Sequence, residues 1–162
     1  MTDGDIGLVV AIPRVRRNKH ECDHERRLVR LGRRLGSAMA YPDGYRASPD
    51  ILAQEDGRPN ALGLVEDATL AGRHREARPV GVFWTADATG PDAEILDVRP
   101  HEPRRHDVGS RQPADGGLGE IRHFVSIGKA LPPGKVTSGT RYAGPSAAEA
   151  AIATSQERPG PP

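Results

Sequence analysis

The alternation of apolar and polar positions predicts short strands and helices separated by polar segments. The run Ile6–Ile12 is apolar throughout and is stopped by Pro13, which is typical of a buried strand. From about residue 20 to residue 40 the apolar positions recur at steps of three and four instead. This spacing predicts a long N-terminal helix with a single apolar stripe. The stripe consists of Leu28, Leu31, Leu35 and Met39.

Further helices are predicted from start and stop signals. The segments 48–57 and 60–72 each begin at a residue that commonly caps helices and end at a glycine. Ser146 and Glu149 form a capping box ahead of the alanine-rich run 147–154. The sequence therefore predicts two short helices in the middle of the chain and a well-defined helix near its end.

Strand patterns dominate the second half. Residues 79–85 and 93–98 are rich in β-branched and aromatic side chains, and 136–142 form a weaker candidate. The clearest alternation covers 119–127, where every second residue is apolar or histidine. Because these strands cluster and do not alternate with helices, the predicted fold class is α+β: a small single domain with the long N-terminal helix, a few clustered strands and a C-terminal helix.

Composition lowers the expected stability of this domain. The chain has 162 residues, a length that suits one domain, but only 4% of them are aromatic. We expect residues 1–157 to form one marginally stable α+β domain with partly disordered loops. Within it, residues 99–119 form a long loop rich in proline, glycine and charge. Residues 158–162 form a disordered tail.

Charge and cysteine content restrict the compartment more than the function. The 23 Lys+Arg and 22 Asp+Glu residues leave a net charge of +1, and the one cysteine excludes an internal disulfide. The longest apolar run, Ile6–Ile12, is too short to cross a bilayer, so we expect no membrane partner and a cytoplasmic location. Nearly all the cations are arginine, and Gly, Ala and Pro are abundant. These residues share GC-rich codons, so an unselected reading frame, not adapted to fold, is one interpretation.

One short motif suggests metal chemistry. His20 and His24 enclose Glu21 in an H-E-x-x-H pattern, which resembles the zincin metallopeptidases over these five residues. The resemblance implies zinc held by both histidines on one face of a helix, with Glu21 as the catalytic general base. A third ligand would be needed, and the charged neighbours of the motif depart from the zincin pattern. The competing interpretation is a helix start whose histidines extend the apolar stripe.

A basic cluster overlaps the predicted N-terminal helix. Its arginines could neutralise phosphates in a nucleic acid, although no aromatic residue lies among them for stacking on bases. A solvated charged face is the competing interpretation. The candidate nucleic-acid-binding residues are Arg26, Arg27, Arg30, Arg33 and Arg34.

These patterns leave three hypotheses open. The first is an uncharacterised small arginine-rich soluble protein without assignable catalysis. The second is a zinc-dependent hydrolase, and the third is a nucleic-acid-binding protein. No phosphate-binding loop, dinucleotide fingerprint or serine-hydrolase motif adds a fourth.

Overall fold

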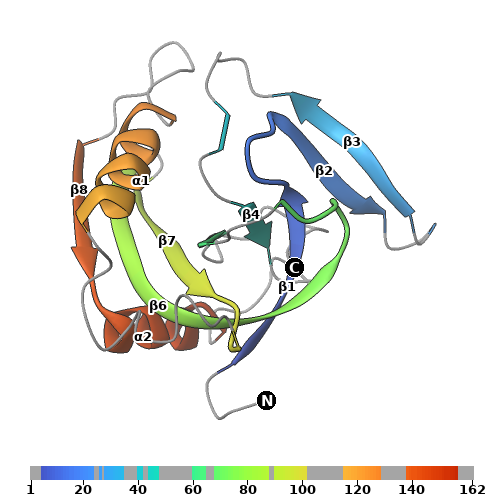
Figure 1. Ribbon diagram of the computed structural model, residues 1–162. Helices are drawn as coiled ribbons and strands as arrows, with labels where there is room; N and C mark the ends of the chain where they lie inside the picture. Colours follow the sequence, from blue (N-terminus) through green and yellow to red (C-terminus); the bar gives the residue numbers. More distant parts are fainter. Residues whose placement is uncertain are drawn as a thin grey trace.

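The computed structural model describes residues 5–23, 26, 28–34, 40–41, 44–47, 60–64, 68–87, 90–101, 115–128 and 138–156. Over these ranges the chain forms eight strands and two helices (Figure 1). In chain order they are β1 (Ile6–Ile12), β2 (Asn18–Asp23), β3 (Leu28–Arg34), β4 (Gly44–Ala47), β5 (Asn60–Gly63), β6 (His74–Asp87), β7 (Gly90–Val98), α1 (Asp115–Gly128), β8 (Ser138–Ala143) and α2 (Pro145–Gln156).

The main sheet closes on itself. Its strand order is β1-β4-β5-β7-β6-β8, and β1 pairs with β6 as well as with β4. The strands β1, β4, β5, β7 and β6 therefore form a closed ring, and β8 is added to β6 outside it. All the pairings are antiparallel except β5 with β7. A small closed five-stranded barrel of this kind is similar to the OB-fold.

The second sheet is a hairpin, β2–β3, which follows β1 and extends beside the barrel (Figure 1). Lys19 pairs with Arg33, His20 pairs with Leu31, and Glu21 pairs with Arg30. Gly32 has no partner across the hairpin, so it is the extra residue of a β-bulge.

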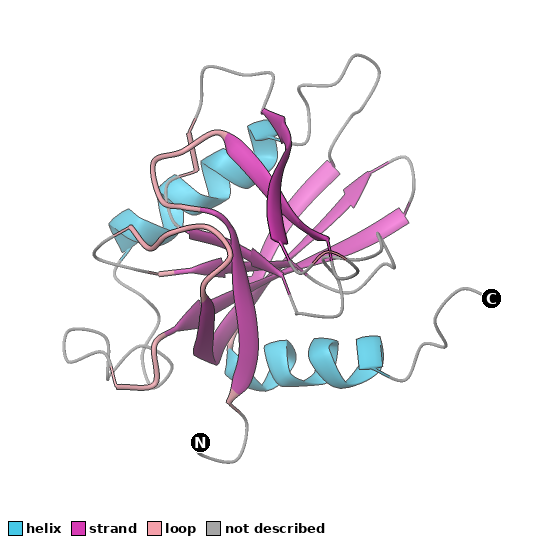
Figure 2. Ribbon diagram, turned by 90° about the vertical axis from the view of Figure 1, so that its right-hand side faces the viewer, coloured by secondary structure: helices cyan, strands magenta, loops and turns pink. Residues whose placement is uncertain are grey.

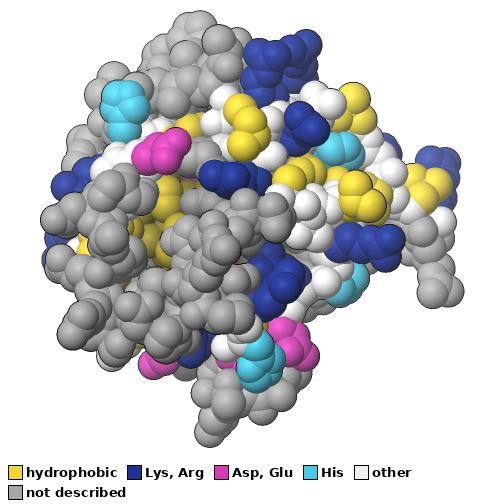
Figure 3. All heavy atoms as spheres, in the orientation of Figure 1, with side chains coloured by type: hydrophobic (Ala, Val, Ile, Leu, Met, Phe, Trp, Pro, Cys, Tyr) yellow, Lys and Arg dark blue, Asp and Glu magenta, His cyan; other side chains and the backbone are white. Residues whose placement is uncertain are grey.

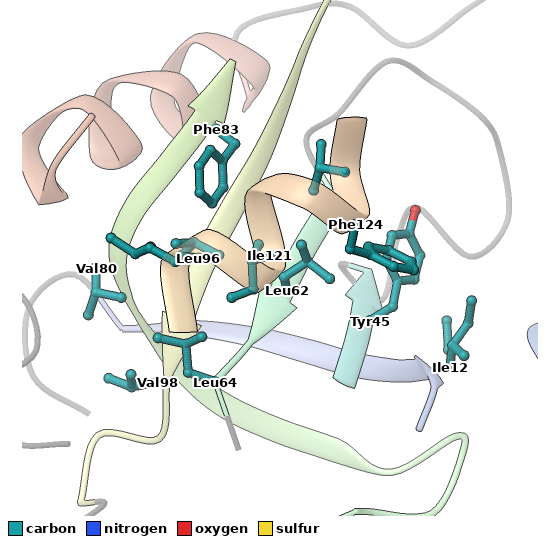
Figure 4. Close-up of a cluster of buried hydrophobic side chains, with 13 residues drawn as sticks. Ile12, Tyr45, Leu62, Leu64, Val80, Phe83, Leu96, Val98, Ile121 and Phe124 are labelled. Atoms are coloured by element: carbon teal, nitrogen blue, oxygen red, sulfur yellow. The ribbon is translucent and has the colours of Figure 1, made fainter. Parts of the chain in front are cut away.

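Side chains that point into the barrel meet α1. Ile121 and Phe124 lie over Leu62 and Leu96, and Tyr45 reaches Phe124 from β4 (Figure 4). Leu118, Ile121, Phe124 and Val125 are the buried residues of α1, at the spacing of one helical face. The helix therefore fills one end of the barrel with apolar side chains.

The outward face of the same strands is covered by α2. Alternate residues of β6 and β7, such as Val82 and Ile95, pack against Ala148 and Ala151 of this helix. Figure 2 shows α1 and α2 on opposite sides of the strands. The central parts of β6 and β7 are thus buried on both faces, which explains their apolar runs over residues 79–84 and 95–96.

The predicted N-terminal helix, and with it the predicted α+β fold class, is wrong, because β2 and β3 occupy this part of the chain. Leu28 and Leu31 are 46% and 59% exposed, so the apolar stripe did not mark a buried face. Leu35 and Met39 lie outside the described residues. The i, i+3 spacing of the leucines does not correspond to a helix here, because this segment is paired across the hairpin.

Two other predicted elements have the wrong type. The segment predicted as a helix over 60–72 begins as strand β5, whose Ala61 and Leu62 are buried. The strand predicted over 119–127 lies in α1. Ile121 and Val125 fit an alternating pattern and a helical face equally well, and the burial of Phe124 together with the exposure of His123 shows the helical one.

Several sequence predictions are confirmed. The strand Ile6–Ile12 is β1, residues 79–85 and 93–98 lie in β6 and β7, and the last helix is present. Its capping box is not, because Pro145 is already helical and the Gly144 carbonyl accepts the N–H groups of Ala147 and Ala148.

The loop predicted over 99–119 extends too far toward the C-terminus, since α1 begins at Asp115. The helix predicted over 48–57 and the predicted tail over 158–162 lie outside the described residues. No helix in the described ranges is long and apolar enough to cross a membrane.

Candidate functional site

The end of the barrel beneath the hairpin carries polar side chains on otherwise apolar strands. On β7, Leu96 and Val98 belong to the interior core, so Asp92 and Glu94, at the same parity, face inward too. Glu94 is only 6% exposed. Across the sheet Tyr45 is paired with Leu62, which is paired in turn with Leu96. Tyr45 and Glu94 therefore both face the interior, two strands apart, and the Glu94 charge acts on the Tyr45 phenol. We call this end of the barrel the mouth.

Two tyrosines line the mouth. The rings of Tyr41 and Tyr45 lie 5.1 Å apart, and Tyr41 also contacts Phe124 of α1 at 4.5 Å between ring centroids. Burial raises the pKa of both phenols well above the ordinary value, and the negative charge of Glu94 raises each pKa further. Arg33 acts in the opposite direction on the pKa of both. Both side chains therefore remain neutral hydrogen-bond donors through the neutral and mildly alkaline range.

The β2–β3 hairpin brings cations to the mouth. Lys19 Nζ lies 5.8 Å from the centroid of the Tyr45 ring, a cation–π arrangement. Residues that pair directly across a hairpin share a face, so Arg33 lies on the same face as Lys19. Glu21 and its partner Arg30 lie on that face too, joined by an ion pair of 3.4 Å. In Figure 3, Lys and Arg side chains and hydrophobic ones gather on the right, over the hairpin.

A turn between β1 and β2 holds Tyr41 in place. Val15 has a φ of 59°, the left-handed region that β-branched residues seldom adopt. Its N–H donates to the Tyr41 carbonyl at 2.8 Å, and the Tyr41 N–H donates to the Arg16 carbonyl at 3.2 Å. The strained residue is thus part of a two-bond connection that fixes the backbone of a mouth tyrosine.

The zinc hypothesis is wrong, because its motif is not helical. His20 and Glu21 lie in β2, where successive side chains point to opposite faces. The His20 Nδ1–H donates to the Ala11 carbonyl at 3.1 Å, and Glu21 is paired with Arg30. His24 lies outside the described residues. In the described ranges, no three or more His, Cys, Asp or Glu side chains are grouped so that they could hold a metal ion.

The arginines predicted to bind nucleic acid are divided between the hairpin turn and β3. Arg26 lies in the turn, Arg30, Arg33 and Arg34 are exposed on β3, and Arg27 is not among the described residues. Only Arg33 belongs to the mouth. They do not form the helical face on which that hypothesis depended.

Sequence reasoning missed most of the mouth. Neither Tyr41 nor Tyr45 was a candidate from the sequence, and Glu94 was only one position of a predicted strand. One signal was available: a chain with three tyrosines places two of them within five residues. Cations beside neutral phenol donors are suited to binding a phosphate-like anion.

Comparison with known proteins agrees with a phosphate-related site. Residues 8–159 match the family model described as inorganic pyrophosphatase. The chain is 35% identical over 156 residues to the inorganic pyrophosphatase of Streptomyces coelicolor, covering 95% of each. It is 38% identical over 130 residues to that of Leifsonia xyli, covering 79% of each. The crystal structure of the inorganic pyrophosphatase from Thermus thermophilus superposes with a TM-score of 0.78 at 28% identity, covering 96% of this chain and 93% of that one.

These matches also correct the sequence-based function hypotheses. An uncharacterised protein without assignable catalysis, an unselected reading frame, a zinc hydrolase and a nucleic-acid-binding protein are all inconsistent with a match over nearly the whole chain. A nucleic-acid partner has no support from the relatives, whose name refers to a small-molecule substrate. The chain belongs to the inorganic pyrophosphatase family.

Proposed function

We propose that this protein binds inorganic pyrophosphate at the barrel mouth and hydrolyses its phosphoanhydride bond. One pyrophosphate and one water molecule give two orthophosphates. The observation that carries this proposal is the family match over residues 8–159, which includes every element that builds the mouth. A cytoplasmic location, predicted from the single cysteine, belongs to the same proposal.

The side chains of the mouth have complementary roles in this proposal. Lys19 and Arg33 supply positive charge for the phosphate oxygens, and Arg33 can donate two parallel hydrogen bonds. Tyr41 and Tyr45 donate from neutral phenols, because burial and Glu94 keep their pKa high. Asp92 and Glu94 face inward on β7, and a carboxylate there can accept the proton of an attacking water.

Divalent cations commonly accompany the phosphates of such substrates, usually through one or two carboxylates. Asp92 and Glu94 are inward-facing carboxylates, but the described residues alone do not complete a metal cluster. The proposal therefore assigns no step to a metal. Magnesium enters only as a condition of the assay.

The first test measures orthophosphate released from pyrophosphate, with magnesium present and with it chelated. We expect turnover by the wild-type chain. Arg33→Ala should raise the KM about tenfold or more, because a charge-assisted contact with substrate is lost. Arg141→Ala is the matched control, since Arg141 is exposed on β8 opposite Trp84 and away from the mouth; its KM should be that of the wild type.

Binding is measured separately from turnover with methylenediphosphonate, an analogue whose P–C–P bridge cannot be hydrolysed. If the chain binds the analogue but releases no orthophosphate from pyrophosphate, the proposal is reduced to a phosphate-binding protein. A wild-type chain that neither binds the analogue nor releases orthophosphate would contradict the proposed function altogether.

A further inference from the structure

At the bulge in β3, residue 32 lies so close to the Glu21 side chain that there is no room for a Cβ atom. A methyl group at Gly32 would overlap the carboxyl group of Glu21 and would lie 2.8 Å from its Cγ. Real Cβ contacts are essentially never that short, so Glu21 can keep its position only while residue 32 is glycine. At Gly7 on β1, by contrast, an added Cβ would meet no atom within 4 Å.

The same bulge determines which charges share a face. Without an extra residue at Gly32, Arg30 and Arg33 would have opposite parity on β3, and only one of them could lie beside Lys19. With it, both arginines join Lys19 and Glu21 on one face of the hairpin. Glu21 is a negative charge beside three cations there, and its side-chain oxygen accepts from Arg30 at 3.4 Å.

We propose that Gly32 is a positioning residue of the mouth, because its missing side chain lets the Glu21 carboxylate lie against the bulge beside Arg30. Glu21 is thereby held away from the phosphate oxygens that Lys19 and Arg33 bind. This inference rests on the proposed function and adds to it a residue that acts on the substrate only through Glu21.

The alanine variant changes the position of that charge. In Gly32→Ala the flexible Glu21 side chain must swing away from the strand, and the carboxylate then repels an anion at the neighbouring cations. We expect the Kd for methylenediphosphonate, with magnesium present, to rise roughly three- to tenfold. The KM for pyrophosphate should rise in parallel. The thermal midpoint should change little, because only an exposed side chain has to move.

A charge-neutral variant separates positioning from a merely structural role. Glu21→Gln keeps the shape of the side chain but removes its charge, so Gly32→Ala should have almost no effect on Kd in the Glu21→Gln background. If Gly32 were needed only to fold the hairpin, the loss of affinity would persist there. Gly7→Ala is the matched control and should bind as the wild type does.

The outcomes distinguish this inference from the proposed function. Equal Kd values for wild type, Gly7→Ala and Gly32→Ala would overturn the role of Gly32 and leave the proposed function intact. An undiminished effect of Gly32→Ala in the Glu21→Gln background would also overturn it. Failure of the wild type itself to bind the analogue would instead count against the proposed function on which the inference stands.

Discussion

At the scale of single residues, the mouth is defined by groups whose properties depend on their neighbours. Nothing in the sequence distinguishes Tyr45 or Glu94 from other polar residues. Their interaction depends on the strand register, which makes Tyr45 on β4 and Glu94 on β7 both face inward. The sequence identified Glu21 and Arg33 as candidates, but for zinc and nucleic-acid chemistry. Residue type was thus informative about polarity, whereas the role of each residue required the strand register.

The buried tyrosines predict a specific loss of stability in alkali. A phenol whose pKa is raised in the folded state stays protonated while the unfolded chain ionises near pH 10, so stability is full below that pH and falls above it. Each such tyrosine contributes a slope of about 1.4 kcal/mol per pH unit. Tyr45→Phe should therefore flatten the decline of the urea midpoint between pH 9.5 and 11.5, taken as roughly the range of tyrosine ionisation. An unchanged slope would show that Tyr45 ionises freely in the fold.

At the scale of elements, local hydrophobic patterns predicted the strands that are buried on both faces. They did not predict the strands whose structure depends on pairing with a neighbouring strand. β1 and parts of β6 and β7 have nearly continuous apolar sequences, which no amphipathic helix imitates. The β2–β3 hairpin carries charge on both strands and exposes its leucines, so its hydrophobic pattern contains no information about its structure. In helix α1, the buried Ile121 and Val125 fit both an alternating strand and one face of a helix. The burial of Phe124 fits only the helix.

The junction of β6 and β8 depends on a glycine at a second bulge. A Cβ at Gly81 would lie 2.5 Å from Tyr142 Cε2 and 3.0 Å from the carbonyl oxygen of Ala143. Because one of these atoms is backbone, β8 itself would have to shift. Tyr142 would then lose its hydrogen bond of 3.4 Å to the Val80 carbonyl and its contact with Phe83.

We expect Gly81→Ala to lower the free energy of unfolding by about 1–3 kcal/mol, as overpacked sites do. Urea denaturation gives this value directly. Gly7→Ala is again the control, and it should be neutral or slightly stabilising because alanine restricts the unfolded chain. Equal midpoints for the two variants would mean that β8 is not fixed to β6 as described.

At the scale of the whole molecule, the closed ring brings together apolar residues from distant parts of the chain. The sequence predicted marginal stability, and the described fold gathers its apolar residues into two clusters on opposite faces of the same strands. Because β6 and β7 contribute to both clusters, disruption of one must affect the other. The barrel should therefore unfold as one cooperative unit.

Substitution of one interior residue tests this cooperativity. Ile121→Ala removes side-chain volume from the α1 cluster and should cost about 2–5 kcal/mol. The single tryptophan, Trp84, packs in the other cluster, against the α2 side. Its fluorescence should report the same lowered urea midpoint as far-UV circular dichroism. Arg122→Ala, an exposed neighbour on α1, should leave both midpoints unchanged; separate midpoints for the two probes in Ile121→Ala would indicate independent halves.

The pairing of β1 with β6 also constrains how the protein folds during synthesis. Ile6 is paired with Ala77, so β1 cannot complete its hydrogen bonds until β6 has been made. Translation proceeds at about 5–20 residues per second, so the edge of β1 that pairs with β6 stays unpaired for several seconds. During this time the β2–β3 hairpin and the β1–β4 and β4–β5 pairings can form, because all of these strands precede β6 in the chain.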